Sequence, residues 1–202
     1  MLANAETFQK RVAKTIASNK FNTDFVINTD RTGYEYRAHV LRTLSNQGEK
    51  ATKLFLGDFN KVMHTYTTQY PITASGRLLP EVFLCTQEPQ GFFGTLVAAK
   101  VIILSEEFEN VFVSASKSGK LTKHRFDVYV EKVLKPYCNG NDFMLILDSW
   151  GGQTDTASLK SKFTDDDGYC SPSVEIPPLC TPFCQPCDLI LFRQVKIFKG
   201  KI

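Results

Sequence analysis

Residues 143–152, FMLILDSWGG, decide the fold class of this chain. The first five are apolar, so both faces of an extended chain would be apolar, which is typical of a central strand covered by helices on both sides. The apolar run stops at Asp148, and two glycines follow soon after as a turn signal. We therefore expect Phe143–Leu147 to form the central strand of a sheet, with Asp148 where that strand ends.

Strand patterns fill much of the chain before this segment. The β-branched run 25–29 predicts a strand that ends at Asp30, with a turn at Gly33. Residues 65–73 and 78–86 predict a hairpin closed by Ser75-Gly76. Two further short strands are predicted at 101–104 and 111–113.

Helix patterns lie at the start of the chain and on both sides of the central strand. Residues 1–20 predict a short helix, and 122–137 the clearest one, with Thr122 as its N-cap. Residues 189–199 predict a last helix capped by Asp188. Strands followed by strands alternating with helices indicate an α/β fold, a mixed sheet flanked by helices.

Composition agrees with one globular domain of 202 residues and 22.8 kDa. Hydrophobic residues make up 43% and charged residues 22%, which excludes a disordered chain. No run approaches the length of a membrane-spanning helix, and the first residues show no secretory signal. With six cysteines, we expect a reducing, intracellular compartment and free thiols or metal ligands.

Charge is spread unevenly along the chain. Residues 1–140 carry 18 basic and 13 acidic side chains, and residues 141–202 carry 6 and 8. A divalent metal site beside a groove for a polyanion would give this pattern, and so would chance.

Three carboxylates stand at the ends of predicted elements: Asp30, Asp148 and Asp188. Singly, each has an ordinary role, in an Asx-turn, a Gly-rich turn or a helix cap. Together they would need a cation, because two carboxylates about 4 Å apart repel by about 4 kcal/mol at an effective dielectric constant near 20. Oxygen ligands favour Mg²⁺ or Mn²⁺, and a two-metal site would activate water or a hydroxyl against a phosphodiester.

Several motifs resemble those of one family. Residues 176–188, IPPLCTPFCQPCD, resemble the LPPxTTxLxQPxD signature of the pogo/Tigger branch of mariner-type transposases. Residues 145–152 resemble the second acidic motif of that DDE superfamily, and 28–33, NTDRTG, its first. The segment 42–50 is similar to the one that follows the first motif. The resemblance runs from about residue 25 to residue 199.

The resemblance implies an RNase-H-like catalytic domain over residues 25–202, after a helical lead-in at 1–24. It implies a DDE/D endonuclease that cuts and joins DNA in the nucleus of a eukaryote. It makes Asp30, Asp148 and Asp188 both the catalytic residues and the ligands of two Mg²⁺ or Mn²⁺ ions.

Some features depart from the family pattern. Ser149 and Gln153 stand where the family usually has Asn and His. The 25 or so residues before the first motif leave no room for the family's helix-turn-helix module, which predicts a fragment or a relic. The alternative function is therefore a catalytically silent, nucleic-acid- or protein-binding relic, although all three Asp residues are intact.

Basic residues gather around the predicted helix 122–137. They are Lys117, Lys120, Lys123, Arg125, Lys132 and Lys135. They form either a solvated helix face or a patch that follows DNA phosphates. The DNA-binding candidates are Lys117, Lys120, Lys123 and Arg125. DNA is the expected partner, with no membrane, and a homodimer stays among the candidate assemblies.

Other constellations offer weaker signals. Cys170, Cys180, Cys184 and Cys187 would suit a structural zinc ion, which is the third hypothesis, but we expect no bound zinc and interpret these cysteines as small packed residues. A redox pair of Cys184 and Cys187 is a weaker alternative. The acidic run 165–168 lacks the spacing of a calcium loop. His39, His64 and His124 are not expected to act as bases.

Overall fold

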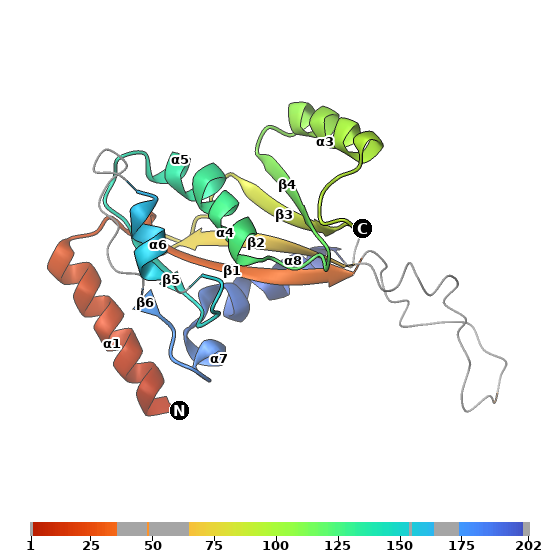
Figure 1. The fold of residues 1–202 in the computed structure, drawn as a ribbon. Helices are drawn as coiled ribbons and strands as arrows, with labels where there is room; N and C mark the ends of the chain where they lie inside the picture. Colours follow the sequence, from red (N-terminus) through yellow and green to blue (C-terminus); the bar gives the residue numbers. More distant parts are fainter. Residues whose placement is uncertain (1, 36–47, 49–64, 154, 164–173, 200–202) are drawn as a thin grey trace.

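The computed structural model describes residues 2–35, 48, 65–153, 155–163 and 174–199. A six-stranded mixed sheet in the order β4-β3-β2-β1-β5-β6 forms its centre (Figure 1). The strands are β1 (Val26–Glu35), β2 (Thr65–Thr73), β3 (Val82–Gln87), β4 (Val111–Ser116), β5 (Met144–Leu147) and β6 (Val174–Glu175). Only β2 runs against the other five strands. The chain thus has the expected α/β architecture, with helices flanking a mixed sheet.

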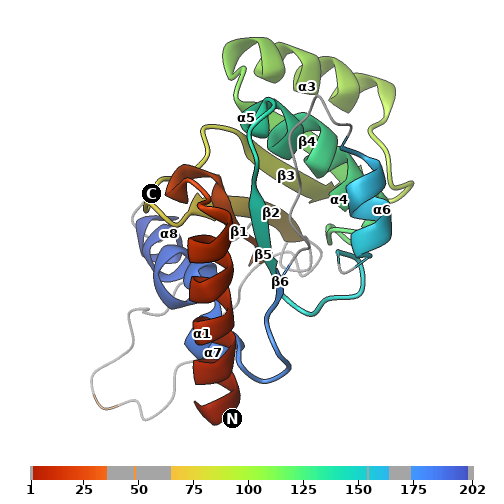
Figure 2. The ribbon, with the colours of Figure 1, turned by 90° about the vertical axis from the view of Figure 1, so that its left-hand side faces the viewer.

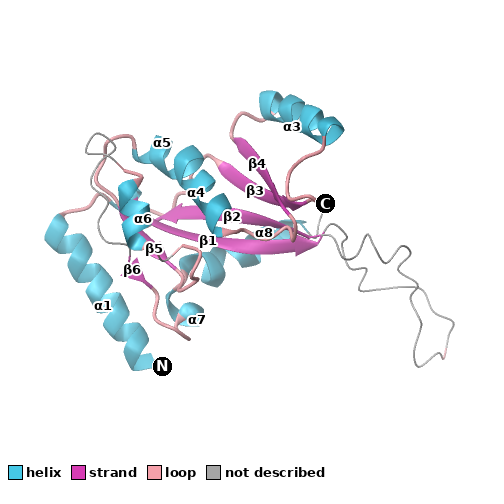
Figure 3. Cartoon of the chain, viewed as in Figure 1, coloured by secondary structure: helices cyan, strands magenta, loops and turns pink. Residues whose placement is uncertain are grey.

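Helices cover both faces of the sheet (Figures 2 and 3). The helix that starts at α4 and the short α6 lie on one face, and α1, α7 and α8 lie on the other. The bounds are α1 (Leu2–Asn19), η1 (Thr23–Phe25), α3 (Thr95–Glu107), α4 (Lys123–Tyr129), η2 (Val130–Leu134), α5 (Lys135–Cys138), α6 (Thr156–Ser161), α7 (Thr181–Cys184), η4 (Cys187–Leu191) and α8 (Phe192–Lys199). Within the described residues, no helix is long and apolar enough to cross a membrane.

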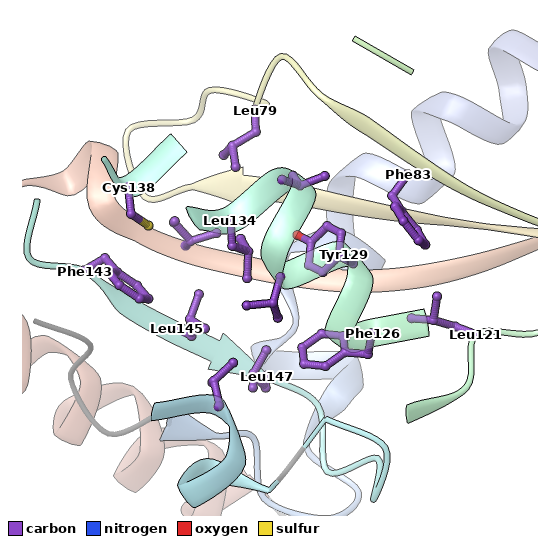
Figure 4. Packing of buried hydrophobic residues seen from close by; sticks show 14 of the residues in the cluster. Leu79, Phe83, Leu121, Phe126, Tyr129, Leu134, Cys138, Phe143, Leu145 and Leu147 are labelled. Atoms are coloured by element: carbon purple, nitrogen blue, oxygen red, sulfur yellow. The ribbon is translucent and has the colours of Figure 1, made fainter. Parts of the chain in front are cut away.

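Strand β5 is the fully buried strand that its sequence predicts, although it lies next to the short edge strand β6 and not at the centre of the sheet. All four of its residues are buried, and the strand lies between β1 and β6. Leu145 and Leu147 pack into the core under α4, η2 and α5 (Figure 4), whereas Met144 and Ile146 pack against α1 and α7. The alternation of these side chains places one apolar layer on each face of the sheet.

Polar side chains also reach into the core under the helix formed by α4, η2 and α5. The Tyr129 hydroxyl, fully buried, lies 2.8 Å from the Thr29 hydroxyl. Gln69 donates from Nε2 to the same hydroxyl over 2.8 Å. This chain of hydrogen bonds ties the helix to both β1 and β2, one residue before Asp30.

The other confirmed predictions are the first helix, the hairpin of β2 and β3, the strand at 111–113 and the helix that starts after Thr122. The Thr122 hydroxyl accepts a hydrogen bond from the Arg125 amide, as an N-cap does. That helix contains a π turn, η2, which its apolar spacing does not reveal.

The predicted strand at 101–104 is wrong. These residues lie in the middle of α3, which has no buried residue, and Ile102 and Ile103 are each about 60% exposed. A short run of β-branched residues fits a strand or a helix equally well until a partner strand is known. Here β3 takes β4 as its parallel neighbour, and such a connection needs a crossover, which α3 supplies.

The predicted end of the first strand is also wrong. Strand β1 continues through Gly33 to Glu35, because β2 pairs with it along its whole length, from Ile27 opposite Thr73 to Glu35 opposite Thr65. The partner strand therefore overrides the turn signal of the glycine.

Asp188 does not cap the last helix. It is the second residue of the π turn η4, and α8 begins only at Phe192. The Leu189 amide already bonds to the Gln185 carbonyl, so the helical path begins before Asp188.

Candidate active site

Two of the three candidate aspartates follow directly after paired residues on neighbouring strands. Strands β1 and β5 run parallel, and their ladder ends with Thr29 beside Leu147. The next residue on β1 is Asp30, and the next one after β5 is Asp148. The parallel pairing therefore brings Asp30 and Asp148 to neighbouring positions at the end of β5, even though β1 itself continues.

Asn28 brings the third segment to this place. Its buried side-chain amide donates from Nδ2 to the Ile146 carbonyl over 3.0 Å and to Gln185 Oε1 over 3.1 Å. Its Oδ1 accepts from the Cys187 amide over 3.2 Å. The Asn28 side chain thus joins β1, β5 and the Gln185–Cys187 segment. Each of these three segments contains or directly precedes one of the aspartates.

The carboxylates act on one another electrostatically. Asp30 is only 8% exposed, and burial is the main cause that raises the pKa of its carboxyl from 3.8 to about 6. The negative charges of Asp188 and Asp148 raise this pKa further, and the backbone amide of Arg31 opposes the rise. Burial first and then the charge of Asp148 also raise the pKa of Asp188. An ionised set of three is therefore costly without a cation.

A fixed cation lies next to the carboxylates. The Arg31 guanidinium lies 3.7 Å from the centre of the Trp150 ring and donates to the Leu121 carbonyl over 3.4 Å. Burial lowers the pKa of Arg31, and the charges of Asp30 and Asp148 oppose that change. Trp150 in turn needs a glycine at 152, because a Cβ there would come within 2.2 Å of its ring.

Asp148 is held by its own turn. Its Oδ1 accepts from the Ser149 amide over 2.8 Å and from the Thr181 hydroxyl over 3.4 Å. Gln153, at the position of the family's His, is buried and donates from Nε2 to the Asp148 backbone carbonyl over 3.0 Å. It therefore supports the turn that carries the carboxylate.

No group of three or more His, Cys, Asp or Glu side chains in the described part of the chain is spaced to hold a metal ion. The donor set nevertheless fits Mg²⁺ or Mn²⁺ chemically, because it consists of carboxylate oxygens whose mutual repulsion a divalent cation would offset. Asp30 is fixed by burial, whereas Asp188 is exposed and can rotate. Joint binding by all three would therefore require a rotation of the exposed side chain.

The DNA-binding candidates occupy two places. Lys117 and Lys120 lie, exposed, in the turn between β4 and α4. Lys123 and Arg125 lie in the first turn of α4. Lys123 pairs with Asp155 over 2.9 Å, and Arg125 donates to the Gly91 carbonyl over 3.1 Å. Because the ion pair of Lys123 and Asp155 is exposed, the Lys123 ammonium group stays accessible to solvent and to phosphate.

The three described cysteines of the last motif, Cys180, Cys184 and Cys187, are buried and are not joined in disulfide bonds to one another. Cys184 and Cys187 direct their sulfurs at backbone carbonyls, those of Ala5 and of Asn28 and Tyr70. This packing agrees with their interpretation as small core residues. Cys170, the acidic run 165–168, His39, His64 and most of the segment 42–50 lie outside the described residues.

Sequence reasoning missed the residues that support the site. Asn28 and Gln185 belong to the quoted motifs, but their pairing links positions far apart in the chain, so no spacing rule reveals it. The charge of Lys196 on α8 opposes the rise in the pKa of Asp188, and no motif in the sequence indicates this contact.

Comparisons with protein-family models, with curated proteins and with solved structures give no match. The functional assignment therefore rests on the residues of the chain and on their geometry.

Proposed function

We propose that this chain is an RNase-H-like, transposase-derived nuclease domain that cleaves and joins DNA phosphodiesters with Mg²⁺ or Mn²⁺. One observation carries the proposal. The three aspartates of the family-like motifs come from distant segments, and yet β1 and β5 pair up to the residues before Asp30 and Asp148, while Asn28 bonds to β5 and to the Gln185–Cys187 segment that precedes Asp188. Chance would rarely bring the acids of three such motifs within electrostatic range of one another.

The residues divide the work according to how firmly each is held. Asp30 is the rigid ligand, since it is buried in a paired strand next to Asn28. Asp148 is the ligand on the turn that Gln153 supports. Asp188 is exposed and closes the site from η4. When bound, the divalent ions would supply an activated oxygen nucleophile and charge stabilisation at the phosphorus.

A catalytically silent relic is the second candidate. Gln153 favours it, because the residue in the position of the family's His is an amide that donates to the Asp148 backbone carbonyl. A relic would keep the fold and the basic surface but would not cleave DNA.

Thermal unfolding with and without Mn²⁺ tests the metal site. We expect Mn²⁺ to raise the melting temperature of the parent chain, because a ligand stabilises only the state that binds it. Asp148→Asn and Asp188→Asn should both lose this response. Glu107→Gln on the exposed end of α3 is the matched control and should keep it. A parent chain that ignores Mn²⁺ at millimolar concentration would contradict the nuclease proposal.

Nicking of supercoiled DNA separates the two candidates. The nuclease proposal requires nicking that depends on Mn²⁺ or Mg²⁺ and that disappears in Asp148→Asn. A chain that binds Mn²⁺ through these residues but leaves every DNA substrate intact is the relic.

A further inference from the structure

A cavity of about 350 Å³, lined by none of the three aspartates, lies among β3, β4, α4, η2, α3 and the loop that leads into α3. Four phenylalanines line it: Phe83, Phe92, Phe93 and Phe112. Phe83 is buried at its base, whereas Phe92 is 64% exposed. The volume is at the lower end of the range of small-molecule sites, which is about 300–1,000 Å³. One flat ring system with a short substituent would fill it.

Ser114 contributes an unused polar group to this cavity. The residue is 6% exposed and lines the cavity from β4. Its hydroxyl has no hydrogen-bond partner among the described residues. Buried hydroxyl groups are normally paired, because an unpaired one costs free energy. Because the hydroxyl is itself buried, a rotation of the Ser114 side chain toward the cavity is needed before it can pair with a donor or acceptor on the edge of a ligand.

Two cations complete the lining. Arg125 and Lys132 reach the cavity from α4 and η2. Arg125 spends one of its five donors on the Gly91 carbonyl, which also fixes the direction of the guanidinium. Aromatic walls with two cations match a ligand that joins an aromatic ring to an anion.

We propose that this cavity binds a nucleobase together with its phosphate. The base lies against the phenylalanine rings, the Ser114 hydroxyl pairs with the edge of the base, and Arg125 and Lys132 hold the phosphate. Base stacking on aromatic side chains and phosphate pairing with cations are the two usual components of single-stranded nucleic acid binding. The same chemistry would come from a free mononucleotide or from a base extruded from a DNA strand. The cavity goes beyond the proposed nuclease function and does not require it.

Titration of the full chain with dAMP in the presence of EDTA tests the first source. We expect dAMP to bind at least tenfold more tightly than inorganic phosphate or the unphosphorylated nucleoside. Phe92→Ala should weaken dAMP binding about tenfold, within the range found when stacked aromatic residues are removed. Lys132→Gln and Ser114→Ala should weaken it as well. Leu96→Ala and Lys100→Gln, both exposed on α3, are the matched controls and should leave it unchanged.

A single-stranded oligonucleotide that carries one fluorescent adenine analogue tests the second source. Its fluorescence should change on binding, and Phe92→Ala should abolish that change while the oligonucleotide still binds through the other basic residues. Binding of the oligonucleotide without binding of dAMP would assign the cavity to an extruded base. The proposal is overturned if Phe92→Ala, Ser114→Ala and Lys132→Gln leave both ligands unaffected, or if neither ligand binds at millimolar concentration.

The outcome is independent of the metal site. Asp148→Asn should bind dAMP as the parent does. If the chain binds dAMP but does not respond to Mn²⁺, the cavity proposal stands and the nuclease proposal is refuted. If it responds to Mn²⁺ but binds no nucleotide, the nuclease proposal stands and the cavity proposal is refuted.

Discussion

Replacing Asp30 with Asn should stabilise the metal-free protein, and only above about pH 4. Folding raises the pKa of this buried carboxyl from 3.8 to about 6, so the folded state binds the proton more tightly than the unfolded state. Well below pH 3.8 the Asp30 carboxyl is protonated in both the folded and the unfolded state, so it does not lower the free energy of unfolding. The cost grows between pH 3.8 and about 6 and is complete above that range. At 1.36 kcal/mol per pH unit, the difference amounts to about 3 kcal/mol.

The measurement is the melting temperature of the parent and of Asp30→Asn at pH 4 and at pH 7.5, in EDTA. For a chain of this length, about 3 kcal/mol corresponds to about 6–12 °C. We expect a gain of this order at pH 7.5 and almost none at pH 4. Mn²⁺ at pH 7.5 should reverse the order, because only the parent keeps the carboxylate as a ligand. Glu107→Gln, which removes an exposed carboxylate on α3, is the control for the loss of one negative charge.

Equal gains at both pH values would refute this reasoning, because they would show that the amide packs better for reasons unrelated to charge. A loss of stability at pH 7.5 would show that the Asp30 carboxylate is stabilised in the folded chain, and therefore that burial and its acidic neighbours do not dominate its environment.

Three further predictions follow from packing. Asn28→Ala should lower the free energy of unfolding, measured in urea, by about 3 kcal/mol or more. It leaves three buried partners without their hydrogen bond, at about 1–3 kcal/mol for each unpaired group. A loss below about 1 kcal/mol would contradict the role of Asn28 in joining the three segments. Gly152→Ala should cost about 1–3 kcal/mol and shift the emission of Trp150, the sole tryptophan, to the red as its ring is displaced; an unchanged spectrum would argue against it. Ile103→Lys on exposed α3 should change thermal stability by less than about 0.5 kcal/mol, and a large loss would show that α3 is covered in solution.

Much of the fold can be predicted from the sequence, because many of its elements are specified by neighbouring residues. Helix α1, the β2–β3 hairpin and the Thr122 cap are each specified by residues that lie close together in the chain. Strand β5 can be predicted because it is buried on both faces, so that no polar residue interrupts its apolar run.

The errors arise where a distant partner decides the outcome. Strand β1 passes through Gly33 because β2 lies beside it, and residues 101–104 are helical because β3 needs a crossover to β4. The candidate site divides in the same way. The sequence names the three aspartates, but the raised pKa of Asp30 and its cause, burial, exist only in the folded chain.

The π turn η2 has a consequence for how the length of this chain can change during evolution. A π turn is an α-helix that has received one extra residue, and the helix on either side keeps its orientation. Loss of one residue from Val130–Leu134 would therefore restore an ordinary turn and leave α4 and α5 facing the core as before. The same loss from the middle of α3 would rotate everything after it by about 100° about the helix axis. Single-codon gaps between this gene and its relatives are thus expected at η2, and at η4 beside Asp188, rather than in the regular helices.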